Sequence, residues 1–287
     1  MPKFILLVAL LAASQLSGQN SLAERAAWNK PVRPFRIVGN IYYVGAQGVS
    51  SFLIVTSQGN ILLDGAFAET APLIEKNISN LGFRLADVKI LLSSHAHWDH
   101  CGGLTELKKL THATTASSLA DTVEANGHRQ LACHDPDRRI EPVEVDRIVS
   151  DGDTIQLGGT TLTAHLTPGH TRGCTTWTMP VTEDGTVHRA LFSCSVTVAQ
   201  NRLVGNTEYP QIVADYQRTF QILRGLQCDV FLAPHPGFFN MEQKLAAREK
   251  GVKQPFVNAG ELQQYLNDSE RDFQHELAKQ KAAMNIK

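Results

Sequence analysis

Three histidines and one aspartate lie within a stretch of six residues, HAHWDH, that begins at His95. The stretch closely follows residues 88–92, a compact apolar run that predicts a buried strand. Side chains alternate in an extended segment, so His95 and His97 should point the same way, while Asp99 and His100 can turn toward a neighbouring position. So dense a cluster rarely arises by chance, and we expect the four side chains to share one site.

Two further histidines stand in turn contexts, His170 in TPGHT and His235 in APHPG. The flanking Pro and Gly set sharp turns and let the backbone come close to a site. Imidazole suits zinc, and an aspartate adds a hard oxygen and a negative charge. Five histidines and Asp99 complete two groups of three, so we expect a site for two metal ions, each with room for water.

The remaining histidines are isolated, and we expect them to be structural or surface residues. They are His112, His128, His134, His165, His188 and His275.

The chain begins with one positive charge, Lys3, and ten apolar residues, 4–13, followed by a small and polar stretch, 14–20. This is the layout of a secretory signal peptide, although a buried N-terminal strand or helix is the alternative. The apolar run is shorter than the roughly 20 residues that span a bilayer, and no later segment looks membrane-spanning. We expect residues 1–18 to be removed and residues 19–287 to form a single exported, periplasmic domain.

Composition narrows the classes of protein and partner. Hydrophobic residues make up 43% and charged residues 19%, which excludes a disordered chain. The net charge of −1 argues against a general polyanion-binding surface, so no nucleic-acid partner is expected. Five cysteines follow the leader, and the odd number leaves at least one thiol unpaired unless it pairs between chains. The pairing itself stays open.

Strand-rich blocks followed by helices occur twice along the chain. We expect strands within 37–64, 88–92, 147–198 and 229–233, and helices near 70–80, 104–110, 210–226, 241–250 and 261–283. This order predicts an α/β protein with two packed β-sheets and helices on the outside, an αββα sandwich.

The metal motif and three other segments resemble a known family. Residues 94–103, SHAHWDHCGG, are similar to the signature of the metallo-β-lactamase superfamily. Residues 166–177 and 228–237 resemble the second and last ligand segments of its subclass B3, and residues 205–216 resemble the connection into the long helix. The resemblance covers nearly the whole chain after the leader, and it implies the metallo-β-lactamase fold with two mixed sheets.

The resemblance also implies roles for individual residues. Two zinc ions would be held, the first by His95, His97 and His170 and the second by Asp99, His100 and His235.

Ser195 falls where this subclass has serine and other subclasses have a cysteine ligand, and it would bind the substrate carboxylate together with Thr197. Cys194 is adjacent, so a shift of one residue would make it a ligand instead. In the family pattern, a cysteine at the place of Cys228 often pairs with one in the C-terminal helices. The corresponding stretch, 261–263, has no cysteine here.

The function implied is zinc-dependent hydrolysis of the ring amide in penicillins, cephalosporins and carbapenems, which confers antibiotic resistance. A metal-bound hydroxide would attack without a covalent intermediate, Asp99 would orient it, and a monomer acting on a small molecule is expected. The chain has no Ser-x-x-Lys and no Gly-x-Ser-x-Gly, the signatures of serine enzymes.

Two other functions stay open. Lactonases and glyoxalase II-like thioesterases share the fold, but many superfamily members carry a bridging carboxylate near the place of Phe192. This chain has Ser-Cys-Ser there, at residues 193–195, which favours a β-lactamase. The second alternative is a non-catalytic metal-binding protein, although an open two-metal cluster is more than a structural zinc site needs.

Overall fold

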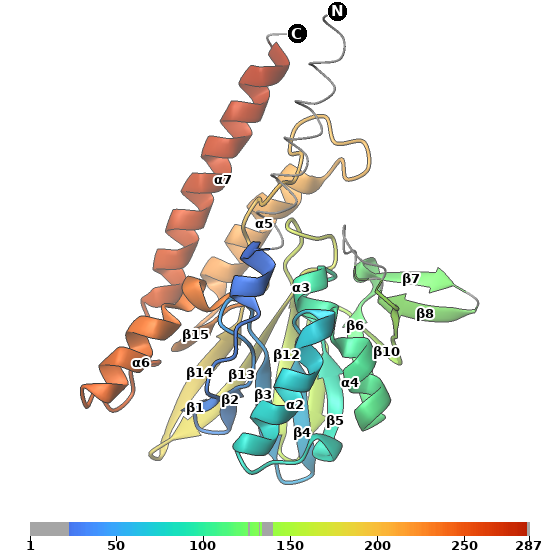
Figure 1. The fold of residues 1–287 in the computed structure, drawn as a ribbon. Helices are drawn as coiled ribbons and strands as arrows, with labels where there is room; N and C mark the ends of the chain where they lie inside the picture. Colours follow the sequence, from blue (N-terminus) through green and yellow to red (C-terminus); the bar gives the residue numbers. More distant parts are fainter. Residues whose placement is uncertain (1–22, 126, 132, 134–139, 286–287) are drawn as a thin grey trace, which may run out of the picture.

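The computed structural model describes residues 23–125, 127–131, 133 and 140–285 (Figure 1). The leader predicted for residues 1–18 lies outside the described residues. Within the described part of the chain, no helix combines the length and the apolar character needed to cross a membrane.

The described part of the chain contains fifteen strands, in runs separated by helices. The strands are β1 (Phe35–Val38), β2 (Ile41–Tyr43), β3 (Phe52–Thr56), β4 (Gly59–Leu63), β5 (Val88–Leu92), β6 (Thr114–Ser118), β7 (Thr122–Ala125), β8 (His128–Leu131), β9 (Val143–Glu144), β10 (Arg147–Val149), β11 (Thr154–Leu157), β12 (Thr160–Leu166), β13 (Thr175–Glu183), β14 (Thr186–Phe192) and β15 (Val230–Leu232). The α-helices are α2 (Ala71–Asn80), α3 (Trp98–Cys101), α4 (Leu104–Thr111), α5 (Ile212–Gly225), α6 (Met241–Glu249) and α7 (Glu261–Asn285), preceded by a short helix over residues 23–28. The 3-10 helices are η1 (Ala68–Thr70), η2 (Leu85–Asp87), η3 (Leu119–Asp121) and η4 (Pro236–Phe239).

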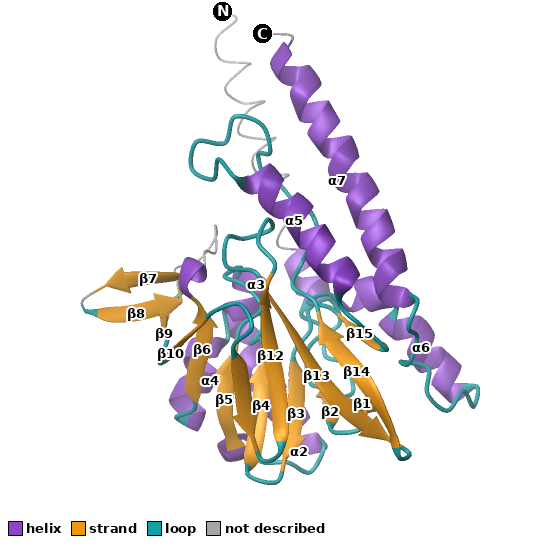
Figure 2. Cartoon of the chain, turned by 180° about the vertical axis from the view of Figure 1, so that it is seen from behind, coloured by secondary structure: helices purple, strands orange, loops and turns teal. Residues whose placement is uncertain are grey.

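Two mixed sheets form the centre of the fold. The larger has the order β1-β2-β3-β4-β5-β6-β10 and the smaller β11-β12-β13-β14-β15. Strands β4, β5, β6 and β10 are parallel neighbours, as are β14 and β15, while the other pairs in the two sheets are antiparallel. Figure 1 shows α2 and α4 in front of the larger sheet. Figure 2, the view from the opposite side, shows the smaller sheet nearest the reader. The predicted sandwich is therefore confirmed.

The central strands of the larger sheet are buried on both faces. Along β4, Ile61 and Leu63 belong to the core between the sheets, whereas Leu62 packs in the cluster that includes α2 and α4. This follows from the period of two along a strand. Between the sheets, the rings of Phe52 and Phe192 meet edge to face with centroids 5.2 Å apart. An uninterrupted apolar run suits such a doubly covered strand.

Helices α5 and α7 pack together beside the smaller sheet. The rings of Phe231 on β15 and Tyr265 on α7 are 5.0 Å apart, and Phe273 of α7 meets Tyr216 of α5 at 5.0 Å. Both figures show α6 and α7 on the β15 side of the molecule.

Strands from both sheets end at one edge. β4 is parallel to β5 and β14 to β15, while β12 and β14 both run antiparallel to β13 and so share a direction. The segments that leave these strands carry Asp64, His95, His170, Ser195 and His235. Chain direction alone therefore delivers side chains from distant parts of the sequence to one place.

A third, small sheet of β7, β8 and β9 was not predicted. Its strands are short, and β8 reads His-Arg-Gln-Leu with only Leu131 buried. So polar a segment gives no apolar alternation from which a strand could be recognised.

The contact between α7 and α5 gives a test of the fold. Phe273→Ala removes a fully buried ring and should lower the free energy of unfolding by about 3–5 kcal/mol. The exposed Lys281→Ala on the same helix should change it by less than about 0.5 kcal/mol. Urea denaturation followed by circular dichroism measures both, and equal midpoints would contradict this packing.

Candidate metal centre

The structure brings all six predicted ligands together in two groups of three. His95, His97 and His170 form the first group, and Asp99, His100 and His235 form the second. Within each group, the potential ligand atoms lie within 4.8 Å of one another.

Ring contacts join the two groups into one cluster. His97 Nδ1 lies 3.1 Å from His170 Nε2 in the first group, and Asp99 Oδ2 lies 3.2 Å from His100 Nε2 in the second. The rings of His95 and His100, one from each group, have centroids 4.4 Å apart. The two groups are therefore close enough for a single water or substrate to contact ions in both.

Three of the clustered imidazoles, those of His95, His170 and His235, are held neutral. Burial, together with the charges of neighbouring histidines, lowers the pKa of His95 well below its usual value and that of His170 to about 3. Burial and His100 likewise lower the pKa of His235 to about 4. Neutral imidazole is the form that binds metal, so these side chains are ready to act as ligands at neutral pH.

Asp99 and His100 stabilise each other's charged forms, the carboxylate and the protonated imidazole. Burial opposes ionisation of Asp99, but the neighbouring histidines, His100 first, outweigh it and lower the pKa of the carboxyl group. Burial also opposes protonation of His100, yet Asp99 raises its pKa. A divalent cation would supply that positive charge without a proton. In addition, the buried Nε2 of His95 has no hydrogen-bond partner among the residues that the structure describes, which also fits a metal ion.

Backbone carbonyls fix the tautomers of two histidines. His170 Nδ1 lies 2.7 Å from the Thr197 oxygen, and His235 Nδ1 lies 2.8 Å from the Gly48 oxygen. A carbonyl can only accept, so each Nδ1 carries the proton and each Nε2 presents its lone pair to the cluster. This orientation is typical of metal-ligating histidines.

A buried carboxylate orients His95 through a serine. Ser94 Oγ donates to Asp64 Oδ2 at 2.7 Å, and the Ser94 amide donates to Asp64 Oδ1 at 2.7 Å. With its hydrogen committed to Asp64, Ser94 Oγ accepts from His95 Nδ1, which is 2.9 Å away. His95 Nε2 is therefore the free ligand atom. Sequence reasoning missed Asp64, although it follows β4 as His95 follows β5.

Asp121 ties the two histidine-bearing segments of the first group together. It accepts from the amides of Ala96 at 3.0 Å and Gly173 at 2.9 Å, and from Thr171 Oγ1 at 3.3 Å. A Cβ at Gly173 would lie 2.4 Å from the carboxyl carbon, so only glycine allows this approach. Asp121 was also missed, because it lies far from the motif in the sequence.

The segment before β1 packs against Trp98 of the motif and against His235 of the second group. Arg25 is 4% exposed, pairs with Glu69 at 2.7 and 2.8 Å, and lies over the Trp98 ring at 4.7 Å. Trp28 meets the edge of the His235 ring, with centroids 5.1 Å apart. No sequence pattern links this helix to the metal motif, so these contacts were not predicted.

Two disulfides form among the five cysteines, Cys101–Cys133 and Cys174–Cys194, and Cys228 is free and buried. The odd thiol is thus accounted for. The alternative in which Cys194 is a ligand is wrong for this structure, because its sulfur is bonded to that of Cys174.

Ser195 and Thr197 lie beside the first group. Their hydroxyl oxygens are 3.0 Å apart, and the Thr197 carbonyl also accepts from the Tyr216 hydroxyl at 2.7 Å. Ser195 is only 2% exposed, whereas Thr197 is partly exposed. Their substrate contacts stay a prediction.

The histidines expected to be structural lie outside both groups wherever the structure describes them. His165, for example, makes a hydrogen bond with Thr178 Oγ1 at 2.9 Å. His134 lies outside the described residues.

A family model described as the metallo-beta-lactamase superfamily matches residues 44–235, more than half of the chain and all six clustered residues. The chain belongs to the metallo-beta-lactamase superfamily. The superfamily implies metal ions, and the donor set, the neutral imidazoles and the unpartnered Nε2 of His95 fit them.

Solved metallo-beta-lactamases share the fold over almost their whole length. BJP-1, a subclass B3 metallo-beta-lactamase of Bradyrhizobium japonicum, is 42% identical, with a TM-score of 0.82 over 90% of this chain and 98% of that one. FEZ-1 from Legionella gormanii is 39% identical, with a TM-score of 0.82 over 88% of this chain and 98% of that one. The chain is thus a β-lactamase-like metallo-hydrolase and is similar to subclass B3.

Curated relatives match by a shorter segment. Hydroxyacylglutathione hydrolase of Rhodopseudomonas palustris (strain BisB5) is 34% identical over 103 residues, 36% of this chain and 32% of that protein. The chain spans about a third of the length of the first curated relatives that it matches.

The Asp64–Ser94–His95 chain gives a test of this superfamily site. Asp64→Asn keeps a side chain suited to the positive φ of 65° but cannot accept both hydrogen bonds from Ser94. Metal affinity, measured by chelator competition, should fall about 10–100-fold. Asp184→Asn, at an exposed position with φ of 49°, is the matched control and should leave it unchanged. Equal affinities in the two variants would contradict the role of Asp64.

Proposed function

We propose that the protein hydrolyses the ring amide of penicillins, cephalosporins and carbapenems with two zinc ions and thereby confers antibiotic resistance. It would act as a monomer on small molecules, without a nucleic-acid partner, in the periplasm after loss of residues 1–18. The observation that carries the proposal is the pair of three-residue groups whose one carboxylate is Asp99.

In this proposal, His95, His97 and His170 hold the first ion and Asp99, His100 and His235 hold the second. The ligands are imidazoles and a single carboxylate, a set that suits zinc. When bound, the two ions would lower the pKa of a coordinated water toward about 7 and polarise the amide carbonyl.

The charge of the site favours an anionic substrate. Two divalent ions held by one carboxylate and five neutral imidazoles leave a net positive site. β-Lactams carry a carboxylate beside the ring, which such a site attracts. The segment after β14, residues 193–195, adds no second carboxylate that would reduce this charge.

The protein's own residues orient the reaction. Asp99 Oδ2 faces His100 and His235, and Oδ1 makes no hydrogen bond to any residue that the structure describes. Oδ1 can therefore accept from the attacking water and hold it toward the carbonyl. The hydroxyls of Ser195 and Thr197 would donate to the substrate carboxylate. Direct attack by water needs no covalent intermediate.

A thioester hydrolase is the second candidate, because hydroxyacylglutathione hydrolase is among the relatives. Lactones are a further substrate class for a di-zinc hydrolase of this fold. The missing carboxylate after β14 and the coverage of 98% of BJP-1 support β-lactams instead.

Imipenem hydrolysis tests the proposal, followed by ultraviolet absorbance beside nitrocefin, a lactone and a thioester. The β-lactams should be the preferred substrates, EDTA should abolish their turnover, and zinc should restore it. His170→Ala should lose zinc and turnover together, by about a hundredfold or more, since even residues behind a metal ligand contribute ten- to a hundredfold.

His165→Ala is the matched control, because this histidine lies five residues earlier and outside both groups. It should keep zinc content and turnover. Preference for the thioester or the lactone by a demonstrably di-zinc protein would contradict β-lactam hydrolysis as the function.

A further inference from the structure

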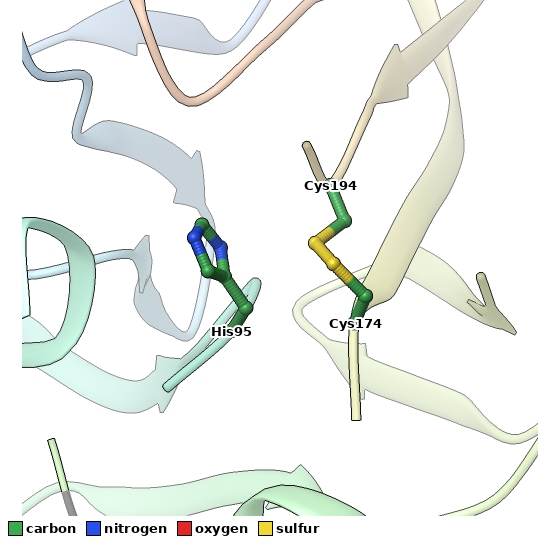
Figure 3. Close-up of side chains that lie close together, drawn as sticks. All are labelled: His95, Cys174 and Cys194. Carbon is green, nitrogen blue, oxygen red and sulfur yellow. A yellow bond between two sulfur atoms is a disulfide. The ribbon is translucent and has the colours of Figure 1, made fainter. Parts of the chain in front are cut away.

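One disulfide lies close enough to His95 for its two sulfurs and a ring nitrogen to share one metal ion. The sulfurs of Cys174 and Cys194 and a ring nitrogen of His95 all lie within 4.8 Å of one another, and all three residues are fully buried. Figure 3 shows the disulfide facing the His95 ring. The proposed hydrolysis makes no use of this disulfide.

The disulfide also joins two segments that border the site. Cys174 follows the segment that carries His170 and leads into β13, and Cys194 leaves β14 just before Ser195. Their Cα atoms are 5.7 Å apart. Because the two residues come from neighbouring strands, the sulfurs would stay close after the S–S bond is broken.

We infer that reduction of the Cys174–Cys194 disulfide creates a third metal-binding group, His95–Cys174–Cys194, that selects a soft divalent cation. Thiolate is the sulfur form that binds metal, and a disulfide cannot supply it. Soft ligands of this kind favour soft metals.

The redox step needs an external dithiol. Its two thiols become a disulfide, the Cys174–Cys194 bond breaks, and the two hydrogens end on the two cysteine sulfurs. On metal binding both cysteine thiols release their protons to solvent. Two thiolates then neutralise the charge of a divalent ion, so the buried group carries no net charge.

The new group would compete with the first proposed group for His95. Both groups draw on the same imidazole ring: its Nε2 is the atom proposed for the histidine group, and its Nδ1 now makes a hydrogen bond with Ser94 Oγ. Two divalent ions on one neutral imidazole would repel each other, so reduction would shift metal from the histidine group toward sulfur. This competition rests on the proposed function, whereas the existence of the third group does not.

Cadmium titration of the oxidised and the anaerobically reduced protein tests the inference. Alkylation and mass spectrometry should count one thiol, Cys228, before treatment with a phosphine and all five cysteines after it. The reduced protein alone should develop the ultraviolet sulfur-to-cadmium charge-transfer band, saturating at one ion. His95→Ala should weaken that binding by about tenfold or more.

Paired variants assign the band. Cys101→Ala/Cys133→Ala removes the other disulfide and should keep the band, whereas Cys174→Ala/Cys194→Ala should lose it although Cys228 remains. Circular dichroism checks the fold of each. Should the second pair not fold, Cys194→Ala alone, which leaves one thiol of the group, should give a smaller band with weaker affinity.

The outcomes separate this inference from the proposed function. A band that survives in Cys174→Ala/Cys194→Ala, a reduced protein without a band, or failure of the phosphine to release these two thiols in the native protein would each overturn it. Metal binding and β-lactam turnover by the oxidised protein test the proposed function alone. A band in the reduced protein without any metal in the oxidised protein would support the third group and contradict the di-zinc site.

Discussion

Five imidazole rings and one carboxylate are crowded into a largely buried cluster, and hydrogen bonds from the surrounding segments keep the lone pairs of three of the rings pointing inward. Burial disfavours the charged form of each ring, and protonated histidines at these separations would also repel one another. Both effects lower the pKa of His95, His170 and His235. Each ring therefore needs a hydrogen bond to its other nitrogen that fixes its orientation. The acceptors that hold three of them are the Ser94 hydroxyl and the carbonyls of Thr197 and Gly48.

Those acceptors come from parts of the chain that meet only in the folded protein. The two sheets bring the carboxyl ends of β4, β5, β12, β14 and β15 to one edge, and Asp64 and Asp121 then fasten the segments that leave them. Arg25, paired with Glu69, packs on Trp98 of the motif, and Trp28 packs on His235. A rigid fold thus fixes a site made of loops.

The clustering of the six side chains was predictable from the sequence because metal binding restricts residue type and spacing so strongly. His95, His97, Asp99 and His100 lie in one short motif, and the apolar run before it predicts the strand that delivers it. The sandwich was predictable for a similar reason, since doubly buried strands and amphipathic helices leave distinct patterns.

The supporting residues were not readable, because their roles arise from tertiary contacts. Asp64 and Asp121 look like ordinary loop aspartates, and nothing near Arg25 in the sequence points to Trp98. Cysteine spacing likewise leaves several pairings open, and only the fold places Cys174 opposite Cys194.

Diffraction from zinc-saturated crystals, collected on both sides of the zinc absorption edge, tests the central claim most directly. The account predicts two anomalous peaks, one among His95, His97 and His170 and one among Asp99, His100 and His235. The second-group ion should contact Nε2 of His235, whose Nδ1 is committed to Gly48. A single peak at saturation, or peaks away from these two groups, would contradict it.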